Sequence, residues 1–285
     1  MKYTEKEYVR SVLPRRPDDA NKGTMGTLLS VCGSYGMAGA AMLAAKAALR
    51  MGVGQQKSAL PKSIYPIAAA NLWESVYLPL IETEDGRISA ANIDLLLADR
   101  HTAVLIGCGM TACADTKKIV RSFIEKSEAP MVLDADALNA IADDPSVLKK
   151  AKAPIVITPH PAEFGRLIHL TPREVNADRE GLAAGFAREY GVVTVLKGAG
   201  TVISSPTGEL LVNPTGNSGM ATGGSGDVLA GMTGALLAQG VKPFDAAAAA
   251  VYLHGLAGDI AAEQLGKASM LPSDLIECIH AALRY

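Results

Sequence analysis

The sequence has no excess of one charge and no long apolar run. Its 27 lysine and arginine residues nearly balance 29 acidic residues, which leaves a net charge of −2, and the basic residues form no run. Nucleic acids and anionic membranes attract basic surfaces, so neither is expected as a partner, and a small-molecule substrate is expected instead. The charged N-terminus, MKYTEKEYVRSVLPRR, lacks the apolar core of a signal peptide, and no apolar run is long enough to span a bilayer. These features predict a cytoplasmic protein.

Cysteines are few and lack metal-binding spacing. The chain has four, none of them in a CxxC pair: Cys32, Cys108, Cys113 and Cys278. Scattered cysteines argue against a disulfide framework and against a zinc site. All four are therefore expected to be reduced and structural.

Two common phosphate-binding motifs are also missing. No GxxxxGK[ST] segment occurs, which excludes a P-loop enzyme. The GCG at Gly107 to Gly109 lacks the third glycine of the dinucleotide-binding fingerprint. A hydride-transfer enzyme is therefore not supported.

Short apolar runs alternate with helical patterns along most of the chain. The apolar runs predict strands at residues 27–32, 54–59, 75–80, 103–106, 131–133, 155–158 and 192–196. Helical patterns lie between most of them, as at residues 38–51, 91–98, 115–126 and 179–190. This alternation predicts an α/β fold with a mostly parallel central sheet and helices on both faces.

The last third of the chain has a different pattern. Residues 201–204 and 209–212 flank the turn signal SPTG and predict a hairpin, and helices are expected near 226–239, 243–264 and 272–283. No linker, low-complexity segment or internal repeat interrupts the chain. A single domain over residues 1–285 is therefore expected.

Polar or glycine-rich segments follow five of the predicted strands. Ligands of mostly parallel sheets bind outside the carboxyl ends of the strands, so these five loops should build one site. In chain order they are GSYGMAGAA, GCGM, DADALN, PHPAE and KGAGT. The first of them could also be only a tight turn with small residues for helix packing.

A further segment, NSGMATGGSGDVLAGM, places glycines directly before one aspartate, Asp227. Apolar residues at helical spacing predict a helix that begins near Ser225. The free N–H groups of a helix start, with glycines that let a ligand approach, suit a phosphate. Asp227 in the first turn either stabilises the helix end or acts as a general base on a hydroxyl beside that phosphate.

The remaining polar candidates each have a structural alternative. Asp134 and Asp136 could be associated with a metal or line the pocket, but Asp136 could equally cap a helix. His160 lies between two prolines that stiffen it, and Glu163 is expected to begin the next helix. Lys197 follows the apolar run VVTVL, which favours a place at the sheet end facing a phosphate over a solvated surface position.

Five segments together resemble a known family. NPTGNSGMATGGSGDVLAGM, ITPHPAEFGRL, VLDADALNAI, VLKGAGTVI and GSYGMAGAAMLAAKAALRMG are similar to segments of the ADP- or ATP-dependent NAD(P)H-hydrate dehydratases, which have a ribokinase-like fold. The resemblance covers the chain from about Lys22 onward. It implies repair of hydrated NADH and NADPH (NADHX and NADPHX). The nucleotide would phosphorylate the ring hydroxyl, and phosphate would then leave.

The resemblance also implies roles for individual residues. The hydrated dinucleotide would contact Ala40, Gly109, His160 and Asp227, and Asp227 would be catalytic. The nucleotide, ADP or ATP, would be held by Lys197, Gly198, Ala199, Gly200, Thr201 and Gly226. Glu163 takes the place of the family's acidic residue that orders Mg²⁺ through water. Two departures, GCGM for the commoner GPGL and SGM for PGM, remove no group that this chemistry needs.

Further expectations concern assembly and partners. The family resemblance implies a homotetramer, in which alanine-rich helices such as residues 245–262 could pack against a neighbour or lie buried within one chain. Because the chain begins shortly before its first predicted strand, the epimerase domain fused to some relatives is expected to be a separate protein. The strongest alternative activity is a ribokinase-like kinase of a small alcohol, which would share the GxGD element. A nucleotide-binding regulator without catalysis is a third reading, disfavoured by the intact Asp227.

Overall fold

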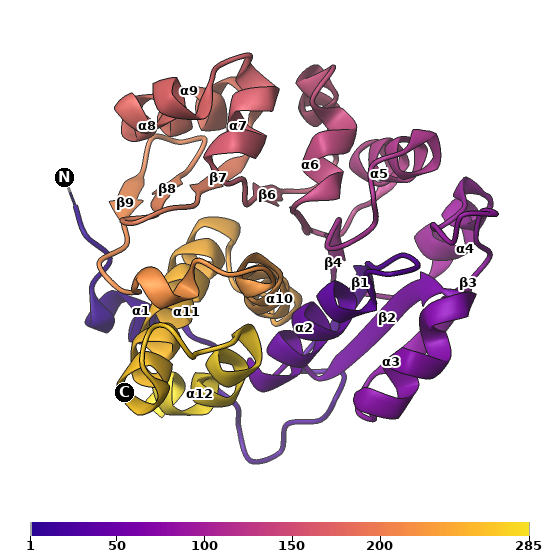
Figure 1. Cartoon of the computed structure of the whole chain (residues 1–285), viewed down its shortest axis with the longest axis horizontal. Coiled ribbons are helices and arrows are strands. Elements are labelled where there is room, and N and C mark those ends of the chain that lie inside the picture. Colours follow the sequence, from indigo (N-terminus) through magenta and orange to yellow (C-terminus); the bar gives the residue numbers. More distant parts are fainter. Residues whose placement is uncertain (1, 285) are drawn as a thin grey trace.

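The structure is a computed structural model that describes residues 2–284. Within these residues, a sheet of nine strands forms the centre of the protein (Figure 1). The strand order is β3-β2-β1-β4-β5-β6-β7-β8-β9. Strands β1 to β7 run parallel, and β8 and β9 add an antiparallel hairpin at one edge. The strands are β1 Thr27–Val31, β2 Gln55–Pro61, β3 Val76–Leu80, β4 Ala103–Ile106, β5 Met131–Leu133, β6 Ile155–Ile157, β7 Val193–Leu196, β8 Val202–Ser204 and β9 Leu210–Val212.

Helices cover both faces of this sheet (Figure 1). One face carries α2 Ala38–Arg50, α10 Ser225–Ala238, α11 Pro243–Leu265 and α12 Pro272–Arg284, and α1 Lys6–Val12 packs on α11. The other carries α4 Ile93–Ala98, α5 Ala114–Lys126, α6 Asp136–Ile141, α7 Pro161–Ile168, α8 Pro172–Ala177 and α9 Arg179–Tyr190. Helix α3 Tyr65–Asn71 packs beside β3. The predicted mostly parallel α/β architecture is therefore confirmed.

The apolar character of the central strands explains their position. Every residue of β4, β5, β6 and β7 is buried, as expected for strands covered on both faces. Successive side chains point to opposite faces, so Leu105 joins the core under α10 while Val104 and Ile106 join the core under α5. The predicted strand ends agree with the structure to within two residues.

Two helical features differ from the sequence-based expectations. The short helices α1, α3 and α8 were not predicted, because six or seven residues carry too little periodicity to stand out. The alanine-rich α11 is buried within the chain, since Ala246 to Ala250 are fully inaccessible. Of the two alternatives, packing against a neighbour or burial within one chain, this alanine run takes the second. Among residues 2–284, no helix has both the length and the apolar character required to cross a membrane.

The close crossing of α2 and α10 places the start of α10 at the end of the sheet. A Cβ added at Gly231 of α10 would lie 2.1 Å from the backbone oxygen of Ala44 in α2. Only glycine permits this distance without moving one helix. The contact therefore requires a residue that is otherwise unfavourable in a helix interior.

Gly231→Ala should destabilise the fold. Overpacking of this kind costs about 1–3 kcal/mol, which exceeds the gain of up to ~1 kcal/mol from the better helix propensity of alanine. Urea unfolding measures the difference. Gly185→Ala in α9 is the matched control, because its Cβ would meet nothing within 4 Å, and it should be neutral or stabilising. Equal stability of the two variants would contradict the packing argument.

Candidate active site

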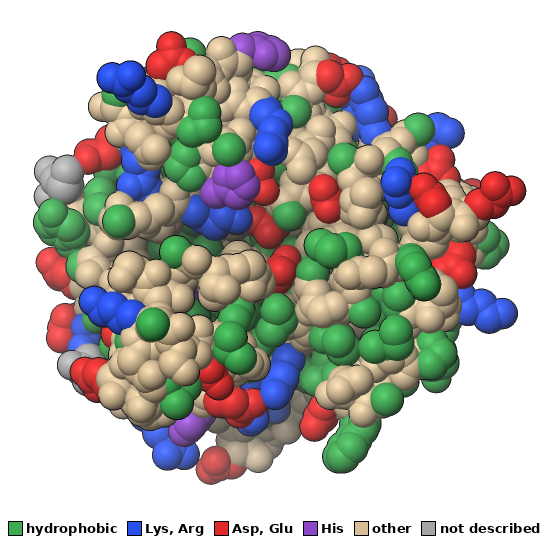
Figure 2. All heavy atoms as spheres, in the orientation of Figure 1, with side chains coloured by type: hydrophobic (Ala, Val, Ile, Leu, Met, Phe, Trp, Pro, Cys, Tyr) green, Lys and Arg blue, Asp and Glu red, His purple; other side chains and the backbone are tan. Residues whose placement is uncertain are grey.

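Polar side chains gather where β4, β5, β6 and β7 end beside the first turn of α10. Figure 2 shows histidine, basic and acidic side chains together near the centre of this face. Asp134, directly after β5, is the centre of the group and is only 1% exposed. Its carboxylate accepts hydrogen bonds from Thr158 Oγ1 at 2.7 Å, Lys197 Nζ at 2.8 Å and Cys108 Sγ at 3.8 Å. The carboxylate after β5 therefore joins the ends of β4, β6 and β7.

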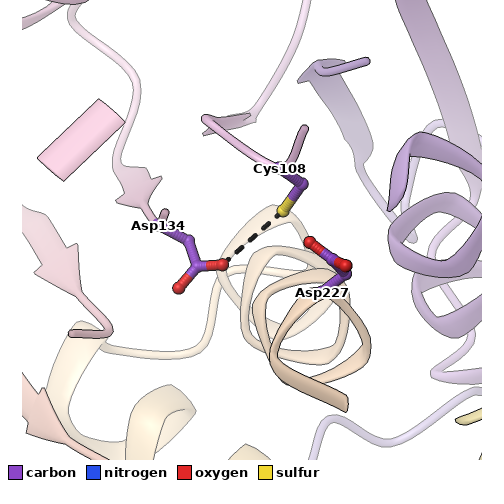
Figure 3. A group of neighbouring side chains, drawn as sticks. All are labelled: Cys108, Asp134 and Asp227. Atoms are coloured by element: carbon purple, nitrogen blue, oxygen red, sulfur yellow. Dashed lines mark hydrogen bonds between the residues drawn. The ribbon is translucent and has the colours of Figure 1, made fainter. Parts of the chain in front are cut away.

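Asp227 faces this group from α10 (Figure 3). Its carboxylate, the Asp134 carboxylate and the Cys108 sulfur all lie within 4.8 Å of one another. Burial raises the pKa of Asp227 to about 6, and the negative charge of Asp134 adds to this rise, whereas Cys108 and Lys197 oppose it. A carboxylate that titrates near neutral pH can both accept and release a proton, as a general base must.

Lys197 supplies the positive charge of the site. Burial lowers its pKa, but the carboxylates of Asp134 and Glu163 outweigh burial, so its pKa is raised overall and the side chain stays cationic. Its Nζ lies 3.9 Å from Glu163 Oε2 and would be 3.3 Å from a Cβ at Gly226. The ammonium group thus lies beside the glycine-rich first turn of α10, where the sequence predicted a phosphate site. It is held there by an ion pair, which the sequence did not reveal.

His160 and Glu163 form a reciprocal cap at the start of α7. His160 Nδ1 accepts hydrogen bonds from the N–H groups of Ala162 and Glu163, and Glu163 Oε2 accepts one from His160 N at 2.8 Å. The helix begins at Pro161, so the expectation that Glu163 begins it is wrong by two residues. Burial lowers the pKa of His160, and the negative charge of Glu163 opposes this shift without cancelling it. Its half-exposed ring is therefore a neutral group at the edge of the site.

Ala40 and Gly109 lie together, as expected for residues that contact one ligand. Gly109 has φ of +66°, and a Cβ added there would be 2.8 Å from Ala40 Cβ. Ser34 Oγ donates to Gly109 O at 2.8 Å, and Gly33 N donates to Cys108 O at 2.8 Å. The loops after β1 and β4 are thus tied into one surface.

The KGAGT loop is held by a residue that the sequence did not indicate. Arg179, at the start of α9, donates to Ala199 O at 2.7 Å and to Leu196 O at 2.8 Å. Gly198 has φ of +151°, and a Cβ there would be 2.9 Å from the Arg179 guanidinium. Thr201 Oγ1 closes the loop by donating to Gly198 O. The contact joins Arg179 to residues 17 and 20 positions away in the chain, so no local pattern marks it.

Two further expectations need correction. Asp136 is not the cap of α6, because Ala135 occupies that position with φ of +49° and Asp136 is the first helical residue. The Asp136 carboxylate instead accepts from Thr111 N at 2.8 Å and so braces the loop after β4. Cys108, expected to be only structural, has its thiol inside the acidic group. Its hydrogen bond with Cys32 and its burial raise its pKa, so it remains a thiol.

The residues present fit Mg²⁺ held mainly through water and phosphate. Mg²⁺ prefers oxygen ligands and usually keeps several waters beside one or two carboxylates. Asp134 and Asp227 offer such oxygens, whereas the Cys108 sulfur is too soft a ligand. Both carboxylate oxygens of Glu163 already contact His160, so direct coordination would break the α7 cap. A water-mediated role for Glu163 is compatible with this geometry.

Comparisons with known proteins identify the family. Residues 28–281 match the family model described as NAD(P)H-hydrate dehydratase. The chain is 39% identical to an ADP-dependent (S)-NAD(P)H-hydrate dehydratase of Neisseria meningitidis, over 91% of this chain and 85% of that protein. It is 44% identical to a bifunctional NAD(P)H-hydrate repair enzyme of Moorella thermoacetica, over 97% of this chain but only 53% of the relative. The chain thus spans about half the length of that bifunctional protein.

A solved structure supports the same assignment. The ADP/ATP-dependent NAD(P)H-hydrate dehydratase of Bacillus subtilis, co-crystallised with ATP and Mg²⁺, superposes with a TM-score of 0.89 at 32% identity, over 99% of this chain and 98% of that one. This agreement confirms the ribokinase-like fold. The family model, the sequence relatives and the structural neighbour all agree, and the chain belongs to the NAD(P)H-hydrate dehydratase family.

Proposed function

We propose that this chain dehydrates NADHX and NADPHX to NADH and NADPH at the expense of ADP or ATP. The observation that carries the proposal is the half-buried Asp227 carboxylate, with its pKa of about 6, in the glycine-rich first turn of α10 beside Lys197. This arrangement provides a base for a hydroxyl group and positive charge for a phosphoryl group in adjacent positions. The family to which the chain belongs defines the substrate.

The reaction begins at Asp227, which takes the proton of the ring hydroxyl. The hydroxyl oxygen attacks the terminal phosphorus of the nucleotide, the bond from that phosphorus to the bridging oxygen breaks, and AMP leaves when ADP is the donor, or ADP when ATP is the donor. The C–O bond of the phosphorylated ring then breaks, phosphate departs with the electron pair, and a ring proton passes to water, which restores the double bond. The ring nitrogen assists this departure by donating electron density, so no stable phosphate ester should accumulate.

The predicted binding residues divide between the two ligands. Lys197, Gly198, Ala199, Gly200 and Thr201 would hold the nucleotide, together with Gly226. Support comes from the Lys197 ammonium, which lies beside Gly226 in the uncapped first turn of α10. Ala40, Gly109 and His160 would contact the hydrated dinucleotide. The contact between Ala40 and Gly109 and the exposed edge of His160 support this division.

Mg²⁺ is the proposed metal. When bound, it would neutralise charge on the transferring phosphoryl oxygens. Glu163 would order it through water, near the carboxylates of Asp134 and Asp227. The chain's own contribution is to hold Lys197 against the same phosphoryl group.

The proposed location is the cytoplasm, and the proposed functional partner is a separate epimerase. A cytoplasmic enzyme fits the proposed substrates, which are nucleotide cofactors. An epimerase that interconverts the two hydrate epimers would act in the same repair, and the Moorella relative is named as a bifunctional repair enzyme. Neither a nucleic acid nor a membrane is proposed as a partner.

Nucleotide and hydrate together should give NADH. Hydrated NADH incubated with ADP and Mg²⁺ is expected to yield NADH, AMP and free phosphate, measured by the return of dihydronicotinamide absorbance and by phosphate release. ATP should also support the reaction, more slowly. A phosphorylated small alcohol formed from a thiazole or pyrimidine substrate, with the hydrate unchanged, would identify the chain as a kinase instead.

Asp227→Asn should abolish turnover but retain nucleotide binding. Removing a general base typically costs ~10²–10⁴ in rate, whereas the backbone donors of α10 survive. In the wild type, kcat/KM should fall as pH decreases through about 6, because the carboxylate becomes protonated below its raised pKa. Stopped assays across pH and calorimetry with ADP measure both effects. A loss below about tenfold with intact binding would argue against the base assignment.

A homotetramer is the proposed assembly. Because α11 is buried, the surface available for it is the apolar patch of α3 and the edge strand β3, where Ile67, Trp73, Val76 and Ile81 are 52%, 84%, 42% and 63% exposed. Figure 2 shows hydrophobic side chains gathered over this side of the molecule. Patches of this kind commonly mark contacts between proteins.

Light scattering should give the mass of four chains. Trp73→Glu should shift the protein toward smaller species, since a charge placed in an apolar interface is not compensated. Leu265→Glu, at an exposed position at the end of α11, is the control and should leave the mass unchanged. A monomeric wild type at micromolar concentration would refute the tetramer.

A further inference from the structure

The first turn of α10 lacks the side-chain cap that normally holds a helix start. Its N-cap is Gly224, with φ of +101° and no side chain to accept from the free N–H groups. A capping side chain would occupy the donors that a phosphate needs. The turn that carries Asp227 must therefore be held in another way.

His254 of α11 provides such a contact. Its Nε2 lies 2.9 Å from the backbone oxygen of Ser225, the first residue of α10 and two positions before Asp227. A carbonyl oxygen can only accept, so Nε2 must carry the hydrogen. Burial lowers the pKa of His254 to about 4, so the ring is neutral and its tautomer is set by this bond.

The same side of α11 also fixes the loop that leads to α10. Asp259 accepts hydrogen bonds from Gly216 N at 2.9 Å and from Asn217 Nδ2 at 2.9 Å. Asn217 Nδ2 donates further to Gly258 O, and its Oδ1 accepts from Gly219 N. The NPTGN segment is thereby tied to the helix one turn after His254.

Glycines let this loop lie directly on α11. A Cβ at Gly255 would be 2.2 Å from Thr215 Oγ1, and one at Gly258 would be 2.4 Å from Met220 Sδ. Thr215 Oγ1 in turn donates to Tyr252 O at 2.8 Å. The HGLAGD segment of α11 thus contacts both the loop before α10 and the first turn of α10.

We propose that His254 is a positioning residue for the reaction: by donating to Ser225 O it holds the uncapped first turn of α10, and with it Asp227 and the phosphate-binding N–H groups, in the reactive arrangement. The proposal rests on the proposed role of Asp227. A helix start that binds a phosphate must keep its N–H groups free. His254 leaves them free because it bonds to a carbonyl oxygen of the turn, Ser225 O. Asp259, in contrast, fixes the preceding loop by accepting from N–H groups of Gly216 and Asn217.

Three substitutions of His254 separate the hydrogen bond from the volume of the ring. In His254→Gln the side-chain amide nitrogen reaches about as far as Nε2 and keeps the donor. In His254→Asn the donor is one bond too short, and in His254→Leu it is absent. Misplacing a catalytic group by about 1 Å can lower the rate ~10²-fold. We therefore expect kcat to fall about 10- to 100-fold in the Asn and Leu variants and to stay within about threefold of wild type in the Gln variant.

The measurements are kcat and KM for ADP-supported dehydration of hydrated NADH, and hydrogen exchange of the amides at residues 225–228. The Asn and Leu variants should lose kcat more than KM and exchange these amides faster, and Gln should restore both. His101→Leu, which removes a buried imidazole before β4 at the other end of the sheet, is the matched control and should retain wild-type kcat. If the Leu variant does not fold, the Gln and Asn pair decides.

Equal activity and exchange in the Gln, Asn and Leu variants, whether all intact or all impaired, would overturn the proposal. Failure of the proposed function gives a different result. If wild type does not dehydrate hydrated NADH with either nucleotide, the exchange of residues 225–228 in the Gln and Asn variants still shows whether His254 holds the turn. Unchanged exchange in the Asn variant would then reject the positioning role by itself.

Discussion

The buried ion pair between Lys197 and Asp134 is the interaction on which the site depends. It joins the ends of β7 and β5 across β6, whose own end contributes the Thr158 hydroxyl to the same carboxylate. Breaking the pair would leave the buried Asp134 carboxylate without compensation, so the pair holds these two strand ends together. The charge of Asp134 then helps raise the pKa of Asp227, and the charge of Lys197 opposes this rise. The pair thus supplies the positive charge available to a phosphate and adjusts the basicity of a carboxylate whose pKa is raised mainly by burial.

Close packing brings α10 to this pair. Gly231 allows α10 to cross α2 at backbone distance, and Gly226 leaves space for the Lys197 ammonium at the helix start. A third glycine, Gly224 at the N-cap, leaves the helix without a side-chain cap. Contacts from α11 compensate, through His254 to the first turn and through Asp259 to the loop before it. The requirements of packing, anion binding and rigidity are therefore met by different helices.

Much of the site was visible in the sequence because its parts follow strands. Apolar runs located the strand ends, and a parallel sheet brings such ends to one edge, so Gly109, Asp134, His160 and Lys197 were expected to converge. The contacts among them were not visible. The pairing of Lys197 with Asp134, the bracing of the loop after β4 by Asp136, and the position of the Cys108 thiol depend on side-chain directions that no local pattern encodes. His254 was hidden for the same reason, within a helix that reads only as alanine-rich.

The sequence by itself determined the alternation of strands and helices, the order of the five loops and the family resemblance carried by their motifs, because these depend on residues close together in the chain. Only the tertiary structure decided which groups meet across long separations. Arg179 reaches the KGAGT loop, and His254 reaches the start of α10, over about twenty to thirty intervening positions. Burial, which sets the pKa values of Asp227 and His254, likewise arises only when the sheet and both helical layers are assembled, since desolvation is a property of the folded environment and not of the residue.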